Sequence, residues 1–231
     1  MYVFDEGLTE GFFVKRYKRF FVDVALPGGE TVTAHCTNTG SLKSCLVPGA
    51  KVLLSRSRNP NRKTAFTWEM IKIGETWVGV NTLLSNKIVR HALKNRMLRE
   101  FSGFDVIRPE FKTGKSRIDF YLENDNEKML LEVKNVTYRE GRYALFPDAP
   151  TQRGLKHLIE LENALNEGYR VGMLYTVSRT DTDVFAPARN IDPVYAETLK
   201  RLLKRGLEIY PYQVAFSPEK AEIVRLLPYE I

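Results

Sequence analysis

The sequence has few of the residues from which common metal and nucleophilic sites are built. It contains two cysteines, Cys36 and Cys45, and three histidines, His35, His91 and His157. The cysteines form no CxxC pair and no two histidines stand at ligand spacing, which argues against a structural zinc site. No nucleophilic triad or glycine-rich phosphate loop is evident either. We therefore expect two buried thiols in a reducing compartment.

Long apolar runs are also missing. No stretch approaches the roughly 20 apolar residues that a membrane helix requires. Asp5, Glu6 and Glu10 interrupt the segment in which a signal peptide would need its apolar core. We expect a cytoplasmic protein without membrane contact. Apolar residues still make up 43% of the 231 residues, which is enough for one large domain or two small ones with real cores.

The charge balance is basic, with a formal net charge of +7. This weakly indicates a polyanionic partner. Three clusters could follow a phosphate backbone. They are Lys15, Arg16, Lys18 and Arg19; Arg56, Arg58, Arg62 and Lys63; and Lys87, Arg90, His91 and Lys94. Trp68, Phe66 and Tyr17 could stack on bases, although strand aromatics more often lie in a core. The alternative for each cluster is an ordinary solvated surface.

The first third of the chain predicts a small β-barrel. Short β-branched and aromatic stretches alternate with turns rich in glycine, proline and asparagine. The expected strands are residues 12–17, 20–26, 31–36, 51–56, 66–73 and 77–80, with a brief helical insert at 41–46. An OB-like barrel is the commonest candidate of this size. We assign it to residues 1–84 as a nucleic-acid-binding domain.

The pattern changes near Leu84 and then predicts an α/β (α+β) domain over residues 85–231. Apolar residues at helical spacing indicate helices, and alternating or continuous apolar runs indicate strands. The expected helices are residues 86–101, 150–166 and 194–204. The expected strands are residues 105–111, 117–122, 129–136, 143–146, 170–177, 207–216 and 223–227.

The strongest chemical signal is RIDFY at residues 117–121 followed by LEVK at 131–134. Side chains alternate along a strand, so Asp119 should face away from Ile118 and Phe120. Glu132 and Lys134 should likewise share one face. A hairpin between the two strands would bring Asp119, Glu132 and Lys134 together.

Two carboxylates are hard ligands suited to Mg²⁺ or Mn²⁺. Such a metal activates water, and a neighbouring lysine offsets charge on a phosphate. The constellation therefore favours phosphodiester cleavage, with a solvated cross-strand cluster as the alternative. The next helix carries Gln152, Arg153 and Lys156 on one face, and Leu155, Leu158, Ile159 and Leu165 on the other. That helix is either part of the site or an ordinary amphipathic helix.

The chain resembles the sugar fermentation stimulation protein A family over its full length. The segments that carry the resemblance are HCTNTG (35–40), PG (48–49), LSRSRNPNRK (54–63), TWE (67–69), SRIDF (116–120), EVKNVT (132–137), PDAP (147–150), RG (153–154) and KH (156–157). The resemblance implies an OB-like domain joined to a PD-(D/E)xK restriction-endonuclease-like domain. It also implies DNA binding with little sequence preference.

The nuclease core carries over as Asp119, Glu132 and Lys134, although Ile118 stands where the signature has proline. We expect Asp119, Glu132 and the Val133 carbonyl to bind the metal. A third carboxylate is expected at Glu110, with Glu100 as the alternative. Gln152 is expected to assist catalysis. The expected DNA contacts are Arg56, Arg58, Arg62, Lys63, Trp68, Lys87, Arg90, Arg117, Arg153 and Lys156.

The leading hypothesis is a Mg²⁺- or Mn²⁺-dependent deoxyribonuclease acting on single- or double-stranded DNA. The rival is a DNA-binding regulatory protein, linked to sugar metabolism, whose site is inactive. An RNA substrate stays open. No protein partner is evident from the sequence, and a homodimer is compatible with it.

Overall fold

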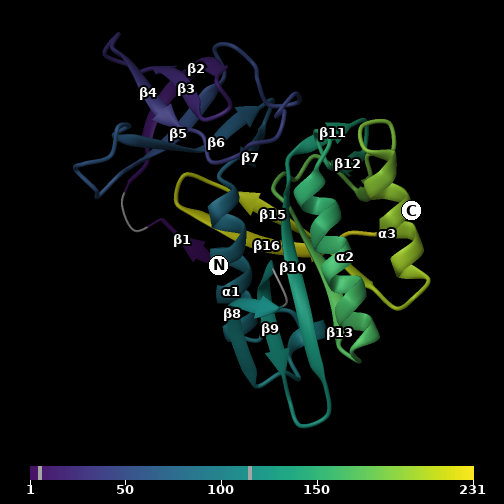
Figure 1. Ribbon diagram of the computed structural model, residues 1–231. Helices are drawn as coiled ribbons and strands as arrows, with labels where there is room; N and C mark the ends of the chain where they lie inside the picture. The colour runs from purple at the N-terminus through teal and green to yellow at the C-terminus, as the bar shows by residue number, and fades with distance from the viewer. Residues whose placement is uncertain (5–6, 114–115) are drawn as a thin grey trace.

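The computed structural model describes residues 1–4, 7–113 and 116–231, and these form two domains side by side (Figure 1). The first domain is an all-β unit, purple to blue in the figure. The second, teal to yellow, is a mixed sheet with helices on both faces. This arrangement confirms the predicted fold class. No helix in the described part of the chain is long and apolar enough to cross a membrane.

The first domain is a closed barrel. Its strands are β2 (Thr9–Tyr17), β3 (Phe21–Ala25), β4 (Thr31–His35), β5 (Lys51–Arg56), β6 (Phe66–Ile73) and β7 (Thr76–Gly79). They run in the order β4-β3-β2-β5-β6-β7, and a parallel pairing of β4 with β6 closes the barrel. Alternate side chains point inward and fill it. The expected helical insert at 41–46 is absent, because this segment forms turns.

Trp68 lies inside this barrel and is fully buried. Its ring stacks on Phe13 with centroids 5.5 Å apart. Its indole nitrogen donates a hydrogen bond to the Met70 carbonyl oxygen at 3.1 Å. The prediction that Trp68 contacts DNA is therefore wrong. The ring has no face that a base could reach.

The second domain is built on a seven-stranded sheet of order β1-β16-β15-β13-β10-β9-β8. Its strands are β1 (Tyr2–Val3), β8 (Val106–Thr113), β9 (Ser116–Glu123), β10 (Lys128–Val136), β13 (Arg170–Val177), β15 (Glu208–Phe216) and β16 (Lys220–Leu226). A small sheet of β11 (Tyr138–Glu140), β12 (Tyr143–Phe146) and β14 (Val184–Pro187) lies beside it. The sequence did not predict β11 or β14.

Helices cover both faces of the large sheet. They are α1 (Thr82–Lys94), the short 3-10 helix η1 (Arg99–Phe101), α2 (Gln152–Asn166) and α3 (Pro193–Leu203). Leu158 of α2 and Leu199 of α3 pack on one face, and Val89 and Leu93 of α1 pack on the other. The central strands β10, β13 and β15 pair in parallel. Strands buried on both faces read as continuous apolar runs, which explains why the sequence predicted them.

Two boundaries differ from expectation. The first strand, β1, pairs with β16 and so belongs to the sheet of the second domain. The predicted helix over 86–101 begins at Thr82, where the Asn81 side chain accepts a hydrogen bond from the Leu83 N–H, and it ends near Asn95. Arg96 follows with φ +51, a conformation that breaks the helix before η1.

The two domains share an apolar interface. Leu53 and Met70 of the barrel pack with Leu84 of α1 and Phe216 of β15. Gly79 lies so close to Phe216 that an added Cβ would be 2.2 Å from its ring. Only glycine fits there. The barrel therefore packs directly against the large sheet.

Candidate active site

Asp119 and Glu132 meet where β9 and β10 separate. The last backbone pair of these two strands is Leu131 with Phe120. Beyond it the Val133 N–H donates to Asp119 Oδ2 at 2.8 Å. Glu132 Oε2 accepts the Asp119 N–H at 3.4 Å. Side chains thus replace the backbone ladder, and two carboxylates come together at the opening of the sheet.

The side-chain alternation that the sequence suggested breaks at Asp119. Phe120 and Leu122 pack against α1, whereas Ile118 packs on the α2 side of the sheet. The neighbouring strand is also irregular here. Glu110 has φ +53 between two regular pairs of β8 with β9. The prediction that Ile118 and Phe120 share a face is therefore wrong.

Glu132 is buried among positive and polar groups. It is 1% exposed, and its Oε1 contacts both Lys134 Nζ and His157 Nδ1. Asp119 Oδ1 accepts from Asn86 Nδ2 of α1 at 2.7 Å. Helices on opposite faces of the sheet therefore fix the two carboxylates. A buried carboxylate of this kind is tolerated because its charge is compensated.

The two carboxyl groups differ in acidity. Burial and the nearby Glu132 charge raise the pKa of Asp119 to about 6. Burial alone would raise the pKa of Glu132, but the Lys134 charge and the His157 hydrogen bond outweigh it and lower that pKa. At neutral pH both groups are available as carboxylates, and Asp119 is the one that titrates first as pH falls.

The donors fit a divalent metal that prefers oxygen. Asp119 and Glu132 supply carboxylate oxygens, and the Val133 carbonyl belongs to the strand between Glu132 and Lys134. No group of three or more Asp, Glu, His or Cys side chains in the described residues could hold a metal. Mg²⁺ and Mn²⁺ often take one or two carboxylates and fill other positions with water. The site therefore suits such an ion better than zinc.

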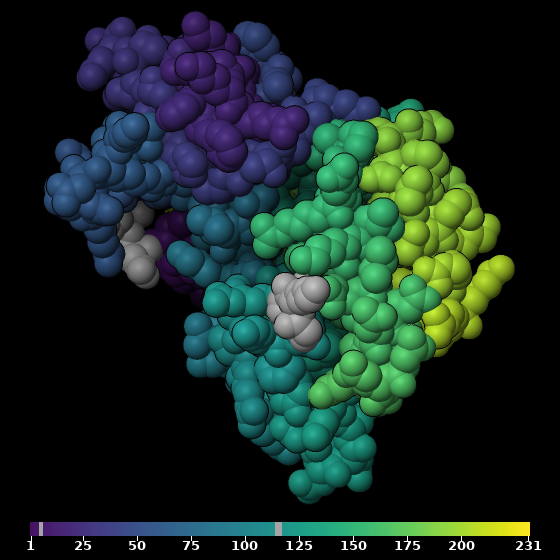
Figure 2. Space-filling view, viewed as in Figure 1, coloured from purple at the N-terminus to yellow at the C-terminus, as the bar shows by residue number. Residues whose placement is uncertain are grey.

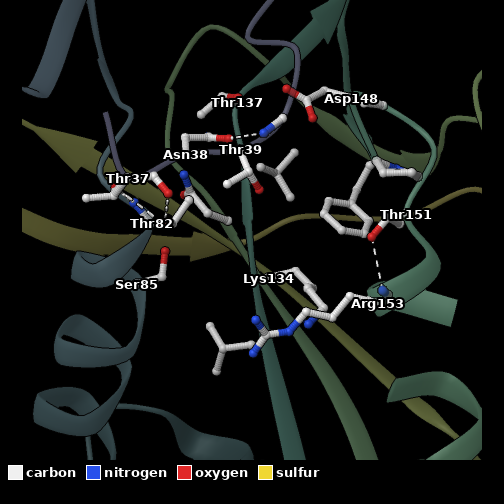
Figure 3. Close-up of a pocket in the computed structure, with 18 of the residues that line it drawn as sticks. Thr37, Asn38, Thr39, Thr82, Ser85, Lys134, Thr137, Asp148, Thr151 and Arg153 are labelled. Carbon is white, nitrogen blue, oxygen red and sulfur yellow. Dashed lines mark hydrogen bonds between the residues drawn. The ribbon is translucent and has the colours of Figure 1, made fainter. Parts of the chain in front are cut away.

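A cleft of about 800 Å³ opens above these residues, between the two domains. Its floor includes Asp119, Glu132 and Lys134. Its opposite wall is residues 37–41 of the barrel, here called the cleft loop. In Figure 3 Thr37, Asn38 and Thr39 lie on one side of the pocket, with Lys134 and Arg153 on the other.

Hydrogen bonds hold the cleft loop against the second domain. Asp148 Oδ2 accepts the Leu42 N–H at 2.8 Å, and Ser41 Oγ donates to the Asp148 carbonyl oxygen at 2.6 Å. A Cβ on Gly40 would lie 2.1 Å from Asp148 Oδ1, so any larger residue would have to displace this carboxylate. The space-filling view shows the barrel resting on the green segment before α2 (Figure 2). Residues of both domains line the cleft.

The polar residues expected on α2 are only partly at the site. Arg153 lines the cleft, whereas Gln152 and Lys156 are exposed and do not. The prediction of a site role for Gln152 and Lys156 therefore lacks structural support. The helix turns His157 inward, together with Leu158, while Ile159 is 46% exposed.

His157 lies in the cluster with Glu132 and Lys134, and the sequence analysis did not predict a site role for it. It lies three residues after Gly154 and four before Leu161, both buried. That spacing places it on the core stripe of α2. The sequence offered one signal for this role: a histidine on the apolar stripe of a helix that packs against the strand carrying Glu132.

Glu110 does not join the metal-ligand candidates. Its side chain is 62% exposed and lies 3.9 Å from Arg117, and it does not line the cleft. The positive φ at Glu110 displaces it from the regular cross-strand position opposite Asp119. Glu100, the alternative, contacts the hydroxyl of Tyr212 instead. Both predictions of a third carboxylate are therefore wrong for this structure.

Most of the basic residues expected to bind DNA lie on the surface. Those exposed are Arg56, Arg58, Lys63, Lys87, Arg90 and Arg117. Arg62 is half-buried and donates to Thr67 Oγ1 at 2.9 Å. Arg62 and Lys87 both lower the pKa of buried Glu69, although burial raises it overall. The loop at 56–63 and α1 therefore both approach the domain junction at Glu69.

Comparison with known proteins agrees with this architecture. The chain matches the model described as "Sugar fermentation stimulation protein RE domain" over residues 83–220. Residues 14–80 match "SfsA N-terminal OB domain". A "Sugar fermentation stimulation protein homolog" of Pelobacter propionicus is 47% identical over 222 residues, covering 96% of each chain. One of Maricaulis maris is 45% identical, covering 99% of this chain and 98% of the other.

A solved structure shows the same fold over the whole chain. It is described as "The structure of Pyrococcus Furiosus SfsA in complex with Ca2+". It superposes with a TM-score of 0.91 at 27% identity and covers 100% of both chains. With both domain models, the full-length relatives and this superposition in agreement, the chain belongs to the sugar fermentation stimulation protein family.

Proposed function

We propose that the protein binds DNA with little sequence preference and cleaves its phosphodiester backbone with a bound Mg²⁺ or Mn²⁺. One observation carries the proposal. Asp119, Glu132 and Lys134 converge in a solvent-open interdomain cleft of about 800 Å³. The related Pyrococcus furiosus protein is described in complex with Ca²⁺, a cation that takes oxygen ligands as Mg²⁺ does.

Each side chain has a distinct task in this proposal. When bound, the metal would supply an activated water and a positive charge at the phosphate. Asp119 and Glu132 hold it, and Asn86 and His157 orient those carboxylates. Lys134, 15% exposed at its side chain, places a positive charge beside Glu132 at the cleft floor. That charge opposes the negative charge that develops on the phosphate in the transition state. Arg153 adds a second cation on the cleft wall.

The second candidate is a DNA-binding regulatory protein with an idle site. The name shared by the relatives refers to stimulation of sugar fermentation, and nothing in the cleft is specific for sugars. The burial of Glu132 and its contacts with Lys134 and His157 favour the enzyme. A protein that only bound DNA would have little reason to bury this charge beside a second carboxylate.

Cleavage assays separate the two candidates. Purified protein is incubated with labelled single-stranded DNA, duplex DNA and RNA, each with Mg²⁺, Mn²⁺ or EDTA. We expect DNA cleavage with metal and none with EDTA. Asp119→Asn and Lys134→Ala should abolish it. Asp125→Asn is the matched control, since Asp125 is exposed in the turn between β9 and β10. DNA binding without metal-dependent cleavage by the wild type would favour the regulatory protein.

A further inference from the structure

The turn between β2 and β3 has an unusual backbone for its sequence. Lys18 has φ +48 and Arg19 has φ +62. Hairpin turns that need two positive φ values usually carry Asn-Gly, because other residues are strained there. Here two exposed basic residues occupy both positions. Strain of this kind is a reason to look for a function that requires the side chains.

Arg16 fastens this hairpin turn (residues 17–20) to the cleft loop. Its Nε donates to the Arg19 carbonyl oxygen at 3.0 Å. Its two terminal nitrogens donate to the Gly40 and Asn38 carbonyl oxygens at 2.8 and 2.6 Å. Arg19 itself lines the active-site cleft. The turn is therefore held at the rim of the cleft and presents Arg19 to it.

Phe20 follows Arg19 in the chain and is exposed at the end of the hairpin turn. Its ring stacks on His35, with centroids 6.5 Å apart and planes 6° apart, yet 44% of the residue is exposed. The Cys36 N–H donates to the Phe20 carbonyl oxygen at 2.8 Å, which fixes the backbone. A single exposed aromatic residue is ordinary. One backed by a parallel ring, with cations next to it, is the arrangement that stacks on unpaired bases.

We propose that Phe20, supported by His35, stacks on an unpaired base of a strand whose phosphates lie against Lys18 and Arg19. The strand entering the cleft is therefore single-stranded or frayed, because the faces of paired bases are covered by their neighbours. This inference rests on the proposed function and names its substrate class. It also gives the barrel a role in binding the strand beside the residues proposed to cleave it.

Binding titrations in EDTA test the inference without any cleavage. The probes are a labelled oligothymidylate of about 20 nucleotides, the same strand with central abasic sites, and a duplex of about the same length. The variants are Phe20→Ala and Phe20→Trp. Tyr229→Ala is the matched control, since Tyr229 is 45% exposed and its backbone pairs with Phe185 of the second domain.

Phe20→Ala should weaken binding of the single strand roughly 5- to 100-fold and binding of the duplex by less than about twofold. Phe20→Trp and Tyr229→Ala should bind as the wild type does. The wild type should bind the abasic strand more weakly than the intact one, and Phe20→Ala should lose that difference.

Equal binding of the single strand by Phe20→Ala and wild type would overturn the stacking role, as would equal losses on strand and duplex. Either result leaves the proposed nuclease untouched. A wild-type protein that binds no DNA at all would instead contradict the proposed function, and this inference with it.

Discussion

Lys134 Nζ lies 3.1 Å from His157 Nδ1, and both atoms contact the same oxygen of Glu132. The strand β10 supplies the lysine and the helix α2 supplies the histidine. Lys134 and His157 are together the polar partners of one carboxylate oxygen of buried Glu132. The other oxygen of Glu132 is left on the side of Asp119. This division uses one oxygen of Glu132 to anchor Lys134 and His157 and leaves the other for the proposed metal.

His157 should act as a positioning residue. His157→Ala removes a partner of Glu132, and loss of such supporting contacts typically lowers metal affinity about 10- to 100-fold. His157→Asn keeps a nitrogen donor near the position of Nδ1 and should restore most of the affinity. Calorimetric titration of the DNA-free protein with Mn²⁺ measures this directly. Unchanged Mn²⁺ affinity in a folded His157→Ala protein would show that the contact is only structural.

Metal affinity should depend on pH through Asp119, whose pKa is raised to about 6 by burial and by Glu132. Binding requires the carboxylate, so protons compete with the metal below that pKa. Mn²⁺ affinity should fall about tenfold between pH 7 and pH 5. Glu132, whose pKa is lowered, stays ionised over this range. Titrations at several pH values in non-chelating buffers test this, and a flat profile would contradict it.

Asp119→Asn should stabilise the metal-free protein at pH 7.5. The folded pKa of about 6 exceeds the ordinary value, so the ionised carboxylate disfavours folding at neutral pH. Asparagine can accept from the Val133 N–H and donate to a rotated Asn86 amide. The gain should be on the order of 1–3 kcal/mol. It should shrink as pH falls from 6 towards 4, where protonation relieves the wild type. Thermal unfolding in EDTA at pH 7.5 and at pH 4 measures the difference in stability between the variant and the wild type. A lower melting temperature at pH 7.5 would refute the prediction.

Asp148 should hold the cleft loop in place. Asp148→Ala leaves the Leu42 N–H without its acceptor, and an orphaned buried donor costs about 1–3 kcal/mol. Leu42 also has φ +52, a strained conformation that this contact helps to maintain. Asp148→Asn retains an acceptor oxygen and should be milder. Hydrogen exchange of the Leu42 amide should accelerate in Asp148→Ala and much less in Asp148→Asn. Equal exchange in all three proteins would show that the contact between Asp148 and the Leu42 N–H does not hold the cleft loop in place.

The basic loop at 56–63 should contribute to DNA affinity through salt-dependent contacts. Each phosphate contact adds about 0.7–0.9 to the slope of log affinity against log salt. Replacing Arg56 and Lys63 with alanine should lower that slope and weaken binding to any sequence, even in EDTA. The control replaces Lys51 and Lys72, which pair with acidic neighbours Glu10 and Glu75. A slope equal to that of the wild type would mean that the loop does not contact the DNA phosphates.

The sequence by itself predicted a barrel followed by a mixed sheet, and it predicted the cluster of Asp119, Glu132 and Lys134. Strands β5, β6, β12 and β13 have the bounds expected from their apolar runs. The barrel and the buried sheet follow from local patterns that do not depend on distant contacts. The spacing of Asp119, Glu132 and Lys134 across one hairpin likewise placed them together, because strand pairing is local in the chain.

Tertiary structure alone decided what surrounds that site. Trp68 became core because the barrel closes over it, and Glu110 turned outward because its backbone takes a positive φ. His157 entered the site through the packing of α2 on the sheet, where Gln152 does not reach. The cleft loop and Asp148 meet only when the two domains dock. Such contacts join residues far apart in the chain, and no local pattern of hydrophobicity or charge encodes their distance.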